Sequence, residues 1–149
     1  MKKVLFLMMM MVVGMATNMK AQSWSTEGPE LANQINMLGE YLSETFRSQG
    51  IPATGSAKYS ASNKSVDIII DFGTLDIIPY VDENILKEMK VDFVDSFIDA
   101  MRSDPNGLNE VREMADLMAK DGGTLRIVLK GAGKQKAATI TAQDLKRAL

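Results

Sequence analysis

The sequence contains neither cysteine nor histidine in its 149 residues. The absence of cysteine excludes disulfide bonds and a lipid anchor on an N-terminal cysteine. The absence of histidine excludes a Ser-His-Asp triad, and without either residue the ordinary zinc, copper, haem and iron–sulfur sites cannot form. We therefore expect no cofactor and no metal, and any catalysis would have to use carboxylates, lysine, tyrosine, serine or threonine.

The common catalytic and phosphate-binding motifs are also missing. The chain has no Gly-x-Ser-x-Gly and no Ser-x-x-Lys, so the hydroxyl nucleophiles that these motifs supply are absent. Residues 131–134, Gly-Ala-Gly-Lys, do not make a Walker loop, because Val128 stands where its first glycine belongs and Gln135 where Ser or Thr belongs. The segment is more typical of a hairpin turn, and the chain leans toward a non-enzymatic role.

The N-terminus carries the pattern of an export signal. Lys2 and Lys3 precede an apolar run over residues 4–16, which is shorter than the roughly 20 residues that a membrane span needs. We expect a signal peptide over residues 1–21, cleaved after Ala21, and a mature protein with no membrane span in the periplasm or outside the cell. Residues 22–27 form a polar leader whose Trp24 is either loose, docked on the fold or placed in a partner, and residues 28–149 fit a single domain.

Charge argues against nucleic acid as the partner. Cleavage would remove three lysines and no acid, which leaves 14 basic and 19 acidic residues and a net charge of −5, whereas nucleic-acid binding depends on cations that neutralise phosphates. The charge is uneven, because residues 120–149 carry +5 and residues 22–119 carry −10. The simplest expectation is that the two regions attract each other within one fold.

Periodicity and turn residues predict an α+β fold. The expected order is α-ββ-αα-ββ-α, as a two-layer sandwich in which helices cover one face of a mainly antiparallel sheet of about four strands. Asp82 and Thr141 are expected to cap the helices that follow them. The expected elements are a helix at 29–49, strands at 58–61 and 66–72, helices at 84–102 and 108–120, strands at 124–130 and 137–141, and a last helix at 142–149.

The helix at 84–102 should anchor the core. Its apolar residues cover more than half of the helix circumference, which predicts contact with a sheet on one side and another helix on the other. The opposite side is an acidic strip that is either a solvated face or a site for cations. The strip consists of Glu88, Asp92, Asp95 and Asp99.

The sheet face turned away from the helices is the candidate binding surface. On the second and third strands it should expose Asp67, Asp71, Arg126 and Lys130, which can form cross-strand ion pairs if the two strands are neighbours. A basic loop over residues 131–136 adds Lys134 and Lys136. The six residues form our candidate site.

Two functions are compatible with this pattern. The first is a small exported binding module of the cell envelope that contacts a protein, peptide or glycan through the open sheet face and the basic loop. The alternative is a carboxylate-dependent hydrolase of cell-wall or glycan material. The alternative requires two acids that converge in a cleft, and Asp67 and Asp71 lie about 13 Å apart along an extended strand.

Overall fold

A computed structural model describes residues 23–37 and 39–149. The predicted signal peptide therefore lies outside the described residues. The described chain forms a four-stranded sheet in the spatial order β1-β2-β3-β4. The pairs β1–β2 and β3–β4 are antiparallel and the central pair β2–β3 is parallel. The strands are β1 (Thr54–Ser60), β2 (Ser65–Asp71), β3 (Thr124–Gly131) and β4 (Lys134–Thr141).

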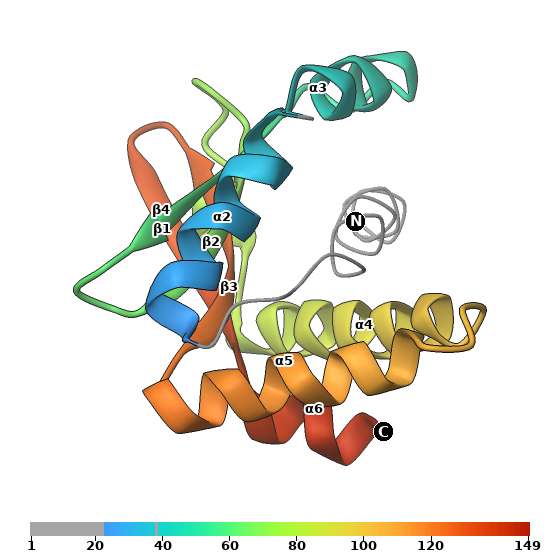
Figure 1. Cartoon of the computed structure of the whole chain (residues 1–149). Coiled ribbons are helices and arrows are strands. Elements are labelled where there is room, and N and C mark those ends of the chain that lie inside the picture. The colour runs from blue at the N-terminus through green and yellow to red at the C-terminus, as the bar shows by residue number, and fades with distance from the viewer. Residues whose placement is uncertain (1–22, 38) are drawn as a thin grey trace.

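Helices pack on one face of this sheet. The helix α2 lies along β1 and β2, α4 packs on β4, and α5 and α6 close the same layer at the end where β3 begins and β4 ends (Figure 1). The predicted α+β fold with a mainly antiparallel sheet is confirmed, and the parallel central pair makes the sheet mixed. The helices are α2 (Trp24–Met37), α3 (Gly39–Ser48), the short 3-10 helix η1 (Ile78–Tyr80), α4 (Glu83–Met101), α5 (Gly107–Asp121) and α6 (Ala142–Ala148).

The helix α4 forms the predicted centre of the core. Asp82 caps it, and its side chain accepts a hydrogen bond of 2.9 Å from the amide of Ile85. Phe93 and Phe97 are fully buried and their rings stack with centroids 6.2 Å apart. Because α4 contacts β4, α5 and α6, the predicted packing between a sheet and a neighbouring helix is confirmed.

The N-terminal helix starts earlier than Pro29. Trp24 is the first residue of α2 and is completely buried. Its amide donates to Asp121 Oδ2 at 2.6 Å, and its indole N–H donates to the carbonyl oxygen of Lys64 at 2.8 Å. Residues 24–27 of the predicted leader are therefore helical, and Trp24 is docked on the fold, which was one of its three alternatives.

The predicted helix 29–49 is divided into α2 and α3. Gly39 begins α3 at a close approach to β1, where a Cβ atom would lie 2.8 Å from the carbonyl oxygen of Gly55. From these two helices, the side chain of Asn36 accepts a hydrogen bond from Ala57 N and Ser43 Oγ accepts one from Gly55 N. These contacts explain why β1 begins at Thr54 instead of Lys58, since small residues with little strand preference are held by neighbouring helices.

The turn between β3 and β4 is also shorter than predicted. Ala132 and Gly133 both have positive φ, 52° and 75°, as in the two-residue turns that match the twist of a hairpin. Residues 134–136, expected in a basic loop, belong to β4 instead. This places their side chains on alternate faces of the sheet, which decides what they can bind.

Candidate functional site

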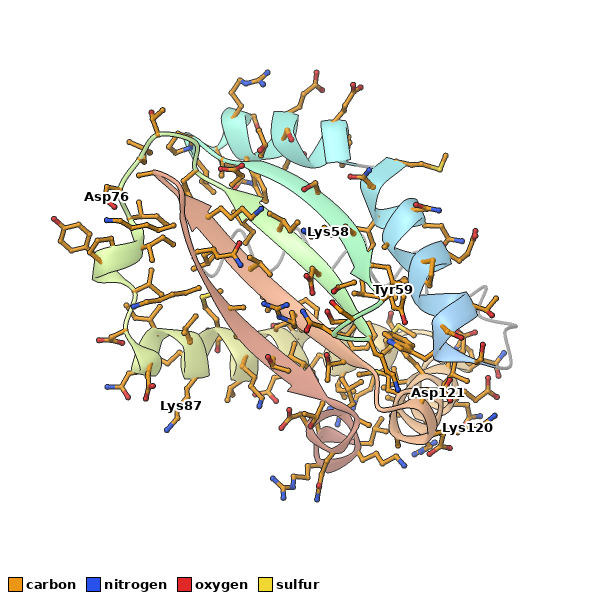
Figure 2. The ribbon with its side chains drawn as sticks, turned by 90° about the vertical axis from the view of Figure 1, so that its left-hand side faces the viewer. Lys58, Tyr59, Asp76, Lys87, Lys120 and Asp121 are labelled. Carbon is orange, nitrogen blue, oxygen red and sulfur yellow. The ribbon has the colours of Figure 1, made fainter. Side chains whose placement is uncertain are left out.

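The sheet face opposite the helices is open. In the view of Figure 2 it faces the reader, and no helix or strand within the described ranges crosses it. Strand pairing arranges its side chains in four rows. We call this surface the open face; its rows are Thr54, Asp71, Lys130 and Gln135; Ser56, Ile69, Val128 and Ala137; Lys58, Asp67, Arg126 and Thr139; and Ser60, Ser65, Thr124 and Thr141.

Asp67 is neutralised within its own row. Asp67 is only 4% exposed, and its carboxylate accepts a hydrogen bond of 2.7 Å from Ser65 Oγ. Arg126 Nη1 lies 3.5 Å from the other carboxylate oxygen. The predicted ion pair between neighbouring strands is thus present, and it satisfies the buried charge of Asp67, which leaves this residue a structural role.

Lys58 and Lys130 differ from Arg126 because neither forms an ion pair with a described residue. Each lies opposite an aspartate in the strand register, Asp67 and Asp71, yet in the described part of the chain no ion pair forms at either lysine. Asp71 accepts a hydrogen bond from the amide of Gly73 at 2.8 Å. Lys58 is exposed near the middle of the open face (Figure 2) and Lys130 is half-buried.

A narrow apolar row separates the two lysines. Ile69 and Val128 are 7% and 3% exposed, although no helix or strand of the described residues crosses them. The stems of lysine and arginine side chains, which the flanking rows contain, can cover apolar surface of this kind. The open face is a polar surface with a thin apolar floor.

Lys134 and Lys136 do not belong to the open face. They share a strand face with the buried residues Ala138 and Ile140, which point toward the helices. Lys134 Nζ lies 3.2 Å from Asp76 Oδ1, and Lys136 Nζ donates to the carbonyl oxygen of Val81. Both lysines thus hold the connection between β2 and α4, so the structure divides the predicted cluster and leaves only Arg126 and Lys130 of its cations on the open face.

Lys58 is the open-face cation that the sequence analysis did not select. It lies in the first strand, for which the sequence predicts only a short element and no pairing register. The register Lys58–Asp67–Arg126 exists only because β1 and β3 flank β2. The only available signal was that side chains alternate between the two faces along a strand. This does not identify the neighbours of Lys58 until the adjacent strand and its register are known.

Neither of two cavities in the described residues brings two carboxylates together. A cavity of about 670 Å³ between α5 and α6 has no acidic lining residue. In a second cavity of about 750 Å³ near Trp24, the acid is Asp121, which already accepts the Trp24 amide. Neither cavity provides the acid pair that the hydrolase alternative requires.

The acidic strip of α4 is likewise dispersed. Asp99 pairs with Arg102 at 3.0 Å within the same helix. Across residues 23–37 and 39–149, no group of three or more acidic side chains lies close enough to hold a metal ion. These observations favour a solvated helix face over a cation site.

No helix in the described portion combines the length and apolar character that crossing a membrane requires. Comparisons with protein-family models, with curated proteins and with solved structures found no match.

Proposed function

We propose that the protein is an exported, non-enzymatic binding module whose open face contacts an extended acidic segment of a partner protein. The observation that carries this proposal is the pair Lys58 and Lys130. In the described residues their charges have no ion-pair partner, and no helix of these residues covers their sheet face. The apolar start of the sequence, with its two lysines, supports export.

Charge favours an acidic partner. The open face carries three cations, Lys58, Arg126 and Lys130, against two carboxylates. Arg126 balances Asp67, and Asp71 is engaged by a backbone amide. The open face therefore has one positive charge in excess, and neither lysine forms an ion pair within the described residues, although the chain as a whole has a net charge of −2. Electrostatic complementarity of this kind directs encounter and excludes basic partners.

The size of the open face favours an extended segment. Four strands about 4.8 Å apart and seven residues long at about 3.3 Å each span an area of about 440 Å². A stable complex of two globular proteins buries roughly 800 Å² on each partner. One extended segment with acidic and small apolar side chains matches the available area and the row of Ile69 and Val128 better.

Fluorescence anisotropy with a synthetic peptide tests the proposal. The probe is a labelled peptide of alternating glutamate and valine, compared with a lysine–valine peptide of equal length. We expect the acidic peptide alone to bind. The double variant Lys58→Gln, Lys130→Gln should lower the affinity for the acidic peptide about tenfold, which corresponds to about 1.4 kcal/mol of binding free energy.

Lys87→Gln is the matched control. Lys87 is an exposed lysine of α4 that points away from the open face (Figure 2), and its removal changes the net charge by the same amount as either single variant. If Lys58→Gln and Lys130→Gln each affect binding no more than Lys87→Gln does, the open face is not the contact surface. Thermal melts should show that all three variants remain folded.

A further inference from the structure

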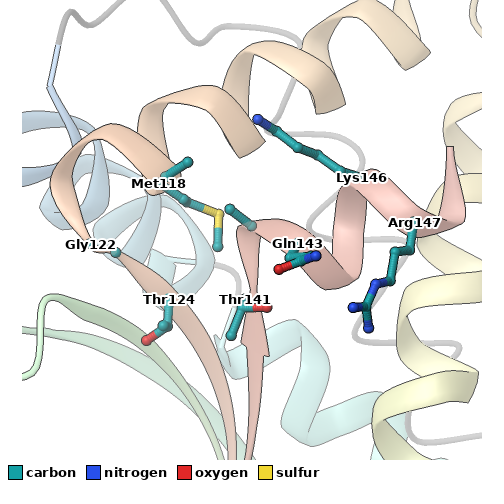
Figure 3. A pocket seen from close by; sticks show the side chains of 10 residues that line it. Met118, Gly122, Thr124, Thr141, Gln143, Lys146 and Arg147 are labelled. Atoms are coloured by element: carbon teal, nitrogen blue, oxygen red, sulfur yellow. The ribbon is translucent and has the colours of Figure 1, made fainter.

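A cavity lies at one end of the open face. It is formed by the end of α5, the start of β3, the end of β4 and α6 (Figure 3), and its volume is about 670 Å³. Ligand pockets of small molecules commonly have volumes of about 300–1,000 Å³. The polar or glycine residues that line it include Gly122, Thr124, Thr141, Gln143, Lys146 and Arg147.

The cavity adjoins the open face. Thr124 and Thr141 lie opposite each other in the last row of the sheet, and both also line the cavity. Arg126 is two residues further along β3 on the same face. A segment that runs along β3 from Lys130 would therefore reach the cavity after about 20 Å of extended strand.

The lining of the cavity selects for negative charge. It contains two cations, Lys146 and Arg147, and no acid. Lys146 is occupied by Asp116 at 2.7 Å, whereas Arg147 is exposed and makes no ion pair with any residue in the described ranges. The planar guanidinium group of arginine matches a carboxylate with two parallel hydrogen bonds.

The neighbours of Arg147 can complete such a contact. Gln143 is exposed and precedes Arg147 by four residues on α6, so the two side chains lie on one helix face. Gly122 has a left-handed φ of 69°, and the space where its side chain would stand is open to a distance of 4 Å. The cavity thus offers a guanidinium and an amide from α6, while Thr124 lies on the other side of Thr141 (Figure 3).

We propose that this cavity is a carboxylate-binding subsite, with Arg147 as its principal ligand and Gln143 as a supporting hydrogen-bond donor. It would receive a carboxylate of the acidic segment that lies along the open face. This inference rests on the proposed function, and it adds a second anchoring point at the α5–α6 end of the sheet.

A titration with citrate tests the subsite by itself. Two-dimensional amide NMR of the purified protein should show saturable shifts at Gly122, Gly123 and Gln143. Arg147→Gln should lower the affinity for citrate at least tenfold. Lys130→Gln, on the open face, should leave that affinity unchanged. Shifts that do not saturate, or that survive in Arg147→Gln, would overturn the subsite. Because Arg147 is exposed, a thermal melt is expected to confirm that this variant is folded.

The acidic peptide then separates the two proposals. Loss of its binding in the double lysine variant, with no change in Arg147→Gln, removes the subsite and leaves the proposed function intact. Weaker peptide binding in both the double lysine variant and Arg147→Gln supports both proposals. Binding that neither variant changes overturns the open face and the connected subsite together, even where citrate alone occupies the cavity.

Discussion

At the scale of single residues, Asp144 connects three parts of the fold. Its carboxylate accepts hydrogen bonds from the amide and the hydroxyl of Thr141, and Thr141 Oγ1 in turn accepts one from Asp144 N, which completes a capping box at the start of α6. Lys90 of α4 lies 2.9 Å from the same carboxylate. Burial raises the pKa of Asp144, but the hydrogen bonds from Lys90 and Thr141 outweigh burial, and the net pKa is lowered.

This geometry predicts that the contribution of Asp144 depends on pH. A lowered pKa in the folded state means that the ionised form stabilises the fold above the unfolded-state pKa of about 3.9, and that this stabilisation is lost as the pH falls through the folded pKa. Asp144→Asn should lower the free energy of unfolding by about 1–2 kcal/mol at neutral pH. Urea unfolding near pH 2 should show a much smaller difference between the two proteins. An equal difference at both pH values would contradict the assigned role.

At the scale of elements, α2 is held by its first residue. Gly123, where α5 turns into β3, lies against the Trp24 indole so closely that a Cβ atom there would overlap the ring. Trp24 thereby connects α2 to the β1–β2 turn through Lys64 and to the end of α5 through Asp121. The first turn of α2 therefore depends on tertiary contacts more than on its own sequence.

Trp24→Ala should accordingly destabilise the whole fold. Truncation of a buried aromatic side chain costs about 3–5 kcal/mol, and guanidinium unfolding followed by far-UV circular dichroism measures this loss. Trp24→Phe keeps most of the apolar volume but loses the hydrogen bond to Lys64, so its loss should be clearly smaller. A loss for Trp24→Ala below about 1 kcal/mol, the range of surface substitutions, would show that α2 is held by other contacts.

The elements that the sequence predicted well are those with strong local signals. In α4 the apolar stripe and the Asp82 cap act within one helix, and in α6 Thr141 acts within one turn, so both could be located without knowledge of the fold. The start of α2, the start of β1 and the division of α2 from α3 depend on contacts between residues distant in the chain, such as Trp24 with Asp121. The same limit applies to the candidate site, because the opposite orientations of Lys130 and Lys136 follow from where β4 begins.

At the scale of the whole molecule, the uneven charge of the sequence is partly balanced by ion pairs within the fold. Basic residues of the C-terminal part pair with acids from earlier in the chain: Arg126 with Asp67, Lys134 with Asp76 and Lys146 with Asp116. Two of these pairs are well exposed, and such pairs contribute about 0–1 kcal/mol each. The stability of the fold therefore comes mainly from its apolar core.

Because charged side chains are proposed to bind the partner while apolar side chains stabilise the fold, added salt should weaken binding without lowering stability. At 0.5 M sodium chloride the screening length falls well below the roughly 10 Å that applies at 0.1 M, so contacts of an acidic peptide with Lys58, Lys130 and Arg147 should weaken. We expect affinity for the glutamate–valine peptide to fall about tenfold or more between 0.05 and 0.5 M salt, since each exposed charge contact loses most of its attraction. The unfolding midpoint should change little, because a core that includes Phe93, Phe97 and Trp24 is not screened by ions. Peptide affinity that is independent of salt would mean that contact is made through apolar side chains, and the two lysines would then have no electrostatic role.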